Sequence, residues 1–379
     1  MSYGIQIFGP IWDISGISNA LRHTAIALYD AGVPVNLIHA TGWSGINAAL
    51  RPSVKAKLDE MTKMPIPQDH VFVNYLPPTK ITHLRNDSMA NICYTLYETD
   101  RCPSVWPMIV AQHDIDEVWV PTQFNMETFI TGGMPADKLH CVPMGVDTAI
   151  YNPGVEPVKL KGQKSFKFLT IMDVKDCKGF DILLDAYYQE FNSSDDVCLI
   201  FKGYSGALDQ AHQNNIKNII KGFKDKNKST ATVIFIGGNI DTSLMPGLYK
   251  NADCFILPTK GEGFCLPAIY SMACGVPALM TRATGYLDYM NDTNGVFLEC
   301  EKKPITNIKW LIREPYQQGH FWWETTVEET RKKMRWAYEH RADLQTLGQK
   351  AATDVKKFSW DNTATAIVDN ILRIANETA

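Results

Sequence analysis

The densest group of residues able to do chemistry lies at 258–267, which reads Pro-Thr-Lys-Gly-Glu-Gly-Phe-Cys-Leu-Pro. It follows a short apolar run, and a helical pattern begins near Pro267, where proline is favoured in a first turn. The backbone amides of 263–266 are therefore expected at a helix N-terminus, where unpaired donors and the helix dipole attract anions. Glu262, beside these donors, could accept hydrogen bonds from sugar hydroxyls. By spacing alone, a simple helix-capping role for Glu262 is equally compatible.

The segments 262–267 and 271–277 closely resemble the E-x7-E signature of family-4 retaining glycosyltransferases (glycosyl transferases group 1), E-G-F-G-L-P-x-x-E-A-M-A-x-G-x-P. The resemblance implies a GT-B fold of two Rossmann-like domains. It also implies that Glu262 is catalytic and that the residues after it meet the donor sugar and its phosphates. These donor-binding candidates are Gly263, Phe264, Cys265 and Leu266.

The second glutamate of the signature is replaced by Tyr270. In the family that glutamate binds the ribose hydroxyls, and a single phenol cannot chelate a diol as a carboxylate does. Tyr270 is kept as a donor-binding candidate that stacks on the nucleotide or contacts the ribose once. Packing in the core is the alternative.

A second motif, at 173–179, follows another apolar run and matches the turn where the family places an arginine and a lysine on the donor diphosphate. The resemblance assigns this phosphate-binding, catalytic role to Lys178. Asp173 occupies the arginine position, and Lys175 is a candidate to replace the missing charge, since lysine binds phosphate as a point charge. Cations are needed here because the leaving nucleoside diphosphate gains charge as the glycosidic bond breaks. The alternative is a pair of exposed loop lysines.

The N-terminal third contributes further candidates through the same resemblance. The loop ending at Gly16 resembles the glycine-containing loop that approaches the donor phosphates, and glycine there lets the backbone come close. Glu98 and Asp100 follow a strand and are expected on the acceptor side, with Glu98 taken as catalytic. Arg22 is interpreted as a surface or interdomain residue.

The elements that position these motifs are strands alternating with helices, which is typical of parallel α/β sheets. The pattern lapses at 152–166, which is polar and rich in turn residues. We therefore expect a GT-B arrangement, with the parallel sheets of two Rossmann-like domains facing a central cleft. The acceptor domain spans 1–155 and is joined by a C-terminal helix at about 358–379, because 358–360 resembles the family's last segment. The nucleotide-sugar domain spans 166–357. Strands are predicted at 5–8, 35–38, 71–73, 92–94, 117–120, 139–142, 168–171, 197–201, 233–236, 254–257 and 276–279, with a helical tail from about Glu324.

Composition narrows the classes of partner and location. The chain has 379 residues and a net charge of −4, so no nucleic-acid partner is expected. Nine cysteines occur without a C-x-x-C pair, which gives no metal-ligand spacing and favours reduced thiols in the cytoplasm. No signal peptide is visible and no apolar run reaches the ~20 residues that span a bilayer, so peripheral membrane contact is the most that we expect.

The resemblance implies a retaining transferase that moves a hexose-type sugar from a nucleotide-diphosphate-sugar to a saccharide or other hydroxyl acceptor. It implies no metal cofactor, since a lysine and helix amides neutralise the diphosphate. No pair of carboxylates can be placed at the separation of about 5–5.5 Å that retaining glycosidases use, so a front-face displacement is expected. A nucleotide-sugar epimerase or hydrolase and a degenerate, non-catalytic binding subunit remain alternatives. A dehydrogenase is disfavoured by the absence of G-x-G-x-x-G.

Overall fold

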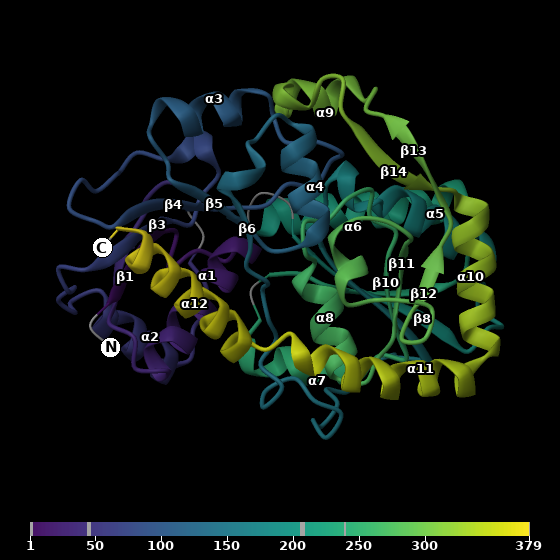
Figure 1. Cartoon of the computed structure of the whole chain (residues 1–379). Helices are drawn as coiled ribbons and strands as arrows, with labels where there is room; N and C mark the ends of the chain where they lie inside the picture. The colour runs from purple at the N-terminus through teal and green to yellow at the C-terminus, as the bar shows by residue number, and fades with distance from the viewer. Residues whose placement is uncertain (1–2, 44–46, 205–208, 239, 379) are drawn as a thin grey trace. The chain divides into compact units, whose positions relative to one another are not determined.

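The computed structural model describes residues 3–43, 47–204, 209–238 and 240–378. The chain divides into two units, one formed by Met1–Gly145 with Lys357–Ala379 and the other by Val146–Lys356. Figure 1 labels the helices and strands of both.

The first unit is built on a six-stranded parallel sheet in the order β2-β1-β3-β4-β5-β6. The strands bury most of their side chains on both faces, as parallel strands covered by helices do. The elements are β1 (Gly4–Gly9), α1 (Gly16–Asp30), β2 (Val35–His39), α2 (Pro52–Met61), β3 (His70–Asn74), β4 (Ala90–Tyr94), α3 (Val105–Gln112), β5 (Glu117–Val120), α4 (Gln123–Thr131) and β6 (Leu139–Cys141).

The last helix, α12 (Trp360–Thr378), belongs to the first unit. The Trp360 ring stacks on His23 of α1 at 5.2 Å between centroids, and Arg373 pairs with Glu117 of β5 at 2.6 Å. A Cβ added to Gly145 would lie 2.5 Å from the Trp360 nitrogen, so only glycine lets the two backbones come this close.

The second unit carries a six-stranded parallel sheet in the order β12-β11-β10-β7-β8-β9. Together the two sheets confirm the predicted α/β class with two Rossmann-like sheets. The elements are β7 (Phe166–Asp173), α5 (Phe180–Glu190), β8 (Val197–Tyr204), α6 (Gln210–Lys226), β9 (Thr232–Ile236), α7 (Met245–Lys250), β10 (Cys254–Leu257), α8 (Leu266–Ala273), β11 (Ala278–Thr281), β12 (Val296–Leu298), α10 (Val327–Glu339) and α11 (Arg341–Asp354).

An antiparallel hairpin of β13 (Cys300–Pro304) and β14 (Phe321–Thr325) projects from the second unit, with the short helix α9 (Ile308–Arg313) between its strands (Figure 1). The sequence predicted only a helical tail from about Glu324. That prediction is wrong at its start, because Glu324 lies in β14 and the first tail helix, α10, begins at Val327.

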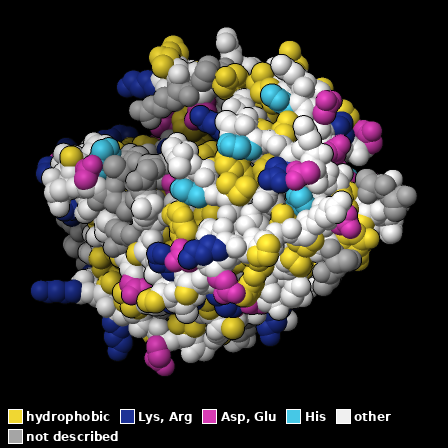
Figure 2. Space-filling view, turned by 90° about the vertical axis from the view of Figure 1, so that its left-hand side faces the viewer, with side chains coloured by type: hydrophobic (Ala, Val, Ile, Leu, Met, Phe, Trp, Pro, Cys, Tyr) yellow, Lys and Arg dark blue, Asp and Glu magenta, His cyan; other side chains and the backbone are white. Residues whose placement is uncertain are grey.

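Surface and thiol chemistry follow the composition. On the face seen in Figure 2, the described basic and acidic side chains are interspersed among neutral ones. All nine cysteines are free, and seven of them are buried. In the described part of the chain, none of the helices combines the length and the apolar composition that crossing a bilayer requires.

Candidate functional site

Two of the predicted motifs follow neighbouring strands at the centre of the second sheet. Counted in chain order from β7, the strands are arranged 3-2-1-4-5-6, so the order reverses between β7 and β10. In open parallel sheets the connections diverge at such a reversal and leave a crevice beyond the strand carboxyl ends, where ligands bind. Lys178 lies in the 3-10 turn Asp176–Lys178 after β7, and Glu262 follows β10.

The side chains of Lys178 and Glu262 meet at this reversal, although 84 positions separate them. The Lys178 ammonium lies 2.9 Å from Oε1 of Glu262, and the two side chains are only 15% and 11% exposed. The hydroxyl of Thr259 lies 3.4 Å from the same carboxylate oxygen. The structure thus brings together two residues that belong to separate sequence motifs.

Backbone contacts fix the two loops against each other. The carbonyl of Cys177 accepts from the Lys260 amide at 2.7 Å and from the Thr259 hydroxyl at 3.0 Å. Gly179 has a φ of +65°, and a Cβ there would lie 2.0 Å from the Pro258 carbonyl oxygen. Only glycine satisfies both demands, so the glycine after Lys178 is what permits the close approach.

The loop after Glu262 presents amides at the start of α8. The Tyr289 hydroxyl lies 2.7 and 2.8 Å from the carbonyl oxygens of Phe264 and Cys265. In a trans peptide the N–H points opposite to the preceding carbonyl, so the amides of Cys265 and Leu266 are directed away from Tyr289. Within the described residues no acceptor pairs with the Leu266 amide. A donor at a helix N-terminus suits an anion.

Cys265 itself occupies an unusual backbone conformation. It is the N-cap of α8 with a φ of +69°, in the left-handed region that glycine tolerates best. The family pattern has glycine at this position. A buried side chain therefore replaces a hydrogen at the point where the backbone turns into the helix.

Two sets of contacts hold this loop in place and were not predicted from the sequence. The Glu262 amide donates to the Thr284 hydroxyl at 3.2 Å, and the Gly285 amide donates to the Glu262 carbonyl at 3.0 Å. Lys260, only 8% exposed, pairs with Glu324 of β14 at 2.9 Å and lies 4.4 Å from the Trp322 ring centroid. These long-range contacts leave no local pattern, so no sequence signal could have found them.

Asp173 and Tyr270, which replace the family's arginine and second glutamate, both have partners inside the second unit. The Asp173 carboxylate pairs with Lys175 at 2.7 Å, and the Lys175 side chain is 51% exposed. Tyr270 is buried and stacks on Tyr151 at 4.3 Å, with Tyr249 edge-on at 6.2 Å. Tyr270 therefore lies in an aromatic cluster, and its contact with a nucleotide stays a prediction, as does that of Lys175.

Lys202 is a further cation that the sequence analysis missed. It lies in β8, opposite Ile171 of β7, near the carboxyl end of the strand. Burial lowers the pKa of its ammonium group. Its Nζ donates to the Gly238 carbonyl at 3.4 Å, and none of the described carboxylates forms an ion pair with it. The strand predicted from the sequence ends at Phe201, one residue before Lys202, whereas β8 continues to Tyr204.

In the first unit, Gly16 is the exposed first residue of α1, and a Cβ there would meet nothing within 4 Å. Arg22 is 5% exposed and donates to the carbonyls of Ile11 and Asp13 at 2.8 and 2.6 Å. The interpretation of Arg22 as a surface residue is therefore wrong, because its side chain is buried and holds the loop after β1, whereas its interdomain role stays a prediction.

The acceptor-side candidates follow β4. Glu98 is half-buried, and Asp100 is buried with its carboxylate 2.9 Å from Arg101. Both residues lie beyond the carboxyl end of their strand, where ligands of parallel sheets bind. Their acceptor roles stay predictions.

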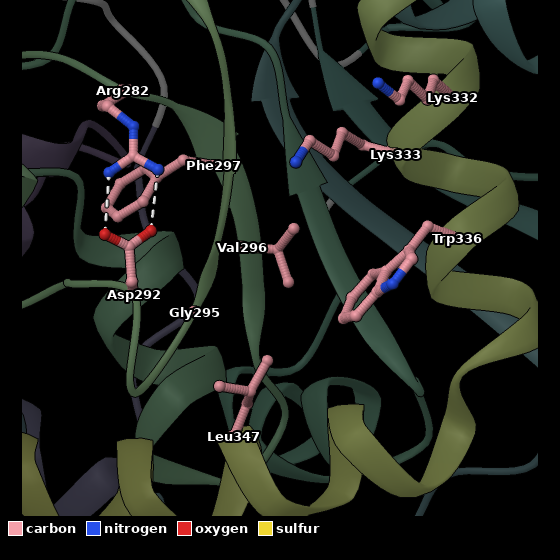
Figure 3. A pocket seen from close by; sticks show the side chains of 9 residues that line it. All are labelled: Arg282, Asp292, Gly295, Val296, Phe297, Lys332, Lys333, Trp336 and Leu347. Carbon is pink, nitrogen blue, oxygen red and sulfur yellow. Dashed lines mark hydrogen bonds and ion pairs between the residues drawn. The ribbon is translucent and has the colours of Figure 1, made fainter.

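A separate pocket of about 210 Å³ lies in the second unit, between β12 and the helices α10 and α11. Figure 3 shows the Trp336 ring and the Lys333 side chain directed into it from α10. On the opposite wall, Arg282 binds both carboxylate oxygens of Asp292 at 2.7 and 3.1 Å. None of the predicted site residues lines this pocket, so concavity alone does not locate the chemistry.

Comparison with known proteins gives a family match within the second unit. The family model described as glycosyl transferases group 1 matches residues 156–341, which is most of the second unit. The second unit therefore carries a group 1 glycosyl transferase domain. A serotype-specific mannosyltransferase, WbdA of Escherichia coli, is 25% identical over 165 residues, which is 44% of this chain and 17% of that protein.

Solved structures of the GT-B fold match along nearly the whole chain. Alr3699/HepE of Anabaena, in complex with UDP and glucose, has a TM-score of 0.67 at 14% identity and covers 98% of this chain and 100% of its own. Sucrose-phosphate synthase of Thermosynechococcus elongatus has a TM-score of 0.72 at 15% identity, covering 99% and 100%. At these identities the likeness shows the fold alone. The chain spans about half or less of the length of the curated relatives it matches.

Proposed function

We propose that the second unit binds a nucleotide-diphosphate-sugar at the strand reversal between β7 and β10. The chain then transfers a hexose-type sugar to a hydroxyl of a saccharide or other acceptor with retention of configuration. The observation that carries this proposal is the contact of 2.9 Å between Lys178 and Glu262, beside the first turn of α8. It places a cation, a carboxylate and helix amides where an open sheet binds ligands.

The diphosphate is bound by the Lys178 ammonium and by the amides of Cys265 and Leu266, which point away from the Tyr289 hydroxyl. The lysine acts as a point charge and the helix dipole adds to it. The group 1 domain and the UDP and glucose bound by the Anabaena protein support a nucleotide-sugar donor. No metal is required in this scheme, since these groups neutralise the charge that develops on the leaving diphosphate.

Lys178 and Glu262 form an ion pair with each other in the structure. An arriving diphosphate competes for the ammonium, and the Glu262 carboxylate becomes available to accept hydrogen bonds from the donor sugar. The leaving phosphate oxygen then takes the proton of the attacking hydroxyl on the same face of the sugar. Glu98 is the candidate in the first unit for contact with the acceptor.

Binding of a sugar nucleotide without transfer is a second candidate function. Asp173 places a carboxylate where the family has an arginine, and its partner Lys175 is thereby partly neutralised. Tyr270 packs on Tyr151 and provides no carboxylate for a ribose diol. Both replacements are expected to lower the affinity for a nucleotide, while Lys178 and Glu262 are still present.

Titration calorimetry with UDP, GDP and ADP, each beside its parent nucleoside, tests the donor site. The diphosphate should bind more tightly than the nucleoside. Equal affinities, or none, would contradict the diphosphate site.

Product analysis of the donor sugar that corresponds to the best nucleotide, with and without saccharide acceptors, then separates the functions. Acceptor-dependent product with an unchanged anomeric configuration supports retaining transfer, free sugar indicates a hydrolase, and unchanged donor indicates a binding subunit.

A further inference from the structure

The β13–β14 hairpin and its helix α9 pack against both loops of the candidate donor site. Cys177, the residue directly before Lys178, lies in one apolar cluster with three buried side chains of this region: Ile305, Trp310 and Trp322. On the other loop, the Trp323 amide donates to the Lys260 carbonyl at 2.9 Å, two positions before Glu262. The hairpin thus touches the chain beside each member of the Lys178–Glu262 pair.

One side chain joins α9 to the turn that carries Lys178. Nδ2 of Asn307 donates to the Asp176 carboxylate at 2.6 Å, across 131 positions of sequence. Asp176 begins the 3-10 turn that ends at Lys178. Oδ1 of the same amide accepts from the Trp310 amide at 3.1 Å and caps α9. Because the donor and the acceptor of the amide each have their own partner, both bonds together fix the orientation of Asn307.

The loop that carries Glu262 is held to the same hairpin by a buried cation. The Lys260 ammonium lies 2.9 Å from Glu324 of β14 and 4.4 Å from the Trp322 ring centroid. Burial of an ammonium is costly unless a carboxylate pairs with it, so Glu324 fixes the direction of the Lys260 side chain. The two loops are also joined to each other, since the Lys260 amide donates to the Cys177 carbonyl at 2.7 Å.

The parallel sheet by itself places these loops only at the ends of β7 and β10. A binding site needs its charged groups held to within about 0.5 Å by contacts outside the ligand. We propose that the hairpin positions the donor site, and that Asn307 is a positioning residue that acts on Lys178 through Asp176. This inference rests on the proposed function, because it concerns how tightly Lys178 binds the diphosphate.

The test exchanges the two partners of this hydrogen bond. Asn307→Asp keeps an oxygen that caps α9 but sets a carboxylate against Asp176. Titration calorimetry should show the affinity for the tightest of UDP, GDP and ADP lowered about tenfold, because Lys178 is displaced from the diphosphate. The affinity for the parent nucleoside should not change. Combining Asn307→Asp with Asp176→Asn restores one donor and one acceptor, and should return the affinity to that of Asp176→Asn alone.

Asn227→Asp is the matched control. Nδ2 of Asn227 also donates to a carboxylate, that of Asp185 at 2.9 Å, but this pair joins the end of α6 to the middle of α5. The control should bind the diphosphate as the unaltered chain does. Amide hydrogen exchange without ligand gives a second readout. Exchange at 173–179 and 259–266 should be faster in Asn307→Asp and slow again in the double variant.

The outcomes separate this inference from the proposed function. If the unaltered chain binds a diphosphate but Asn307→Asp binds it as well as Asn227→Asp does, the positioning role is overturned and the donor site stands. A loss of affinity that the double variant does not recover also overturns the positioning role, since the cause would then be general damage to the fold. If the unaltered chain binds none of the three diphosphates, the proposed function fails and this inference fails with it, whatever the exchange rates.

Discussion

The first sheet reverses its strand order between β1 and β3, and the second between β7 and β10. At the first reversal, a Cβ on Gly9 would lie 2.4 Å from Leu21 and 3.1 Å from Tyr75, so apolar side chains close over the strand end. The Arg22 guanidinium donates to two loop carbonyls. At the second reversal, an ammonium, a carboxylate and helix amides gather instead. The strand reversal is thus closed by apolar packing in the first unit, whereas charged groups and helix amides lie at it in the second.

The largest expected effect comes from the carboxylate of the second reversal. Glu262→Gln keeps the shape and one acceptor but removes the charge, and should lower turnover on the order of 100-fold, as loss of a group that acts in the transition state does. Initial rates at saturating donor measure it. Glu190→Gln is the control, because Glu190 is also ion-paired, with Arg335 at 2.7 Å, but lies at the end of α5. Equal turnover in both variants would leave Glu262 only a structural role.

Lys178→Ala should lower the affinity for a nucleoside diphosphate by about 10- to 100-fold, since hydrogen bonds to charged groups contribute about 1.5–3 kcal/mol. Affinity for the parent nucleoside should not change. Lys221→Ala, which removes an exposed ion pair with Asp225 on α6, is the control and should have little effect. Calorimetry reports both affinities. An equal loss for nucleoside and diphosphate would indicate damage to the fold rather than to a phosphate site.

The first reversal should respond in stability rather than in binding. Arg22→Met leaves two loop carbonyls without their donor and should cost about 2 kcal/mol of unfolding free energy. Lys55→Met, which removes an exposed ion pair with Asp59 on α2, should cost less than about 0.5 kcal/mol. Urea unfolding measures both. If Arg22→Met also weakened diphosphate binding, the loop that ends at Gly16 would belong to the donor site, as the sequence analysis expected.

The strands that could be predicted are those that read as apolar runs, because both faces of a parallel sheet are buried. The β13–β14 hairpin was missed, since 301–303 is charged and 321–323 is aromatic, and neither shows a strand period. The motifs around Lys178 and Glu262 were visible by resemblance, but their direct contact depends on the order of β7 and β10. The braces at Thr284, Tyr289 and Lys260 are long-range contacts that a local pattern cannot contain.

The smallest effect concerns Lys202, the cation of β8 that forms no ion pair with a described carboxylate. Its ammonium is penalised by burial, so its pKa is lower in the folded chain than in the unfolded one. Below the folded pKa the lysine is charged in both states and only the folded chain pays the cost of burying the charge, so Lys202→Met should raise the unfolding free energy.

That gain has a pH window with a defined sign. As pH rises from the folded pKa to the ordinary lysine value of about 10.4, the unaltered chain folds with its lysine neutral, and the advantage of the variant should disappear. Urea midpoints of both chains at neutral pH and near pH 10 measure this difference directly, since other titrating groups are common to both. A constant advantage would show that packing, not charge, is responsible. If Lys202→Met is more stable but binds a nucleoside diphosphate more weakly, Lys202 also contacts the diphosphate. A buried cation that lowers stability is expected at a site where it binds an anion.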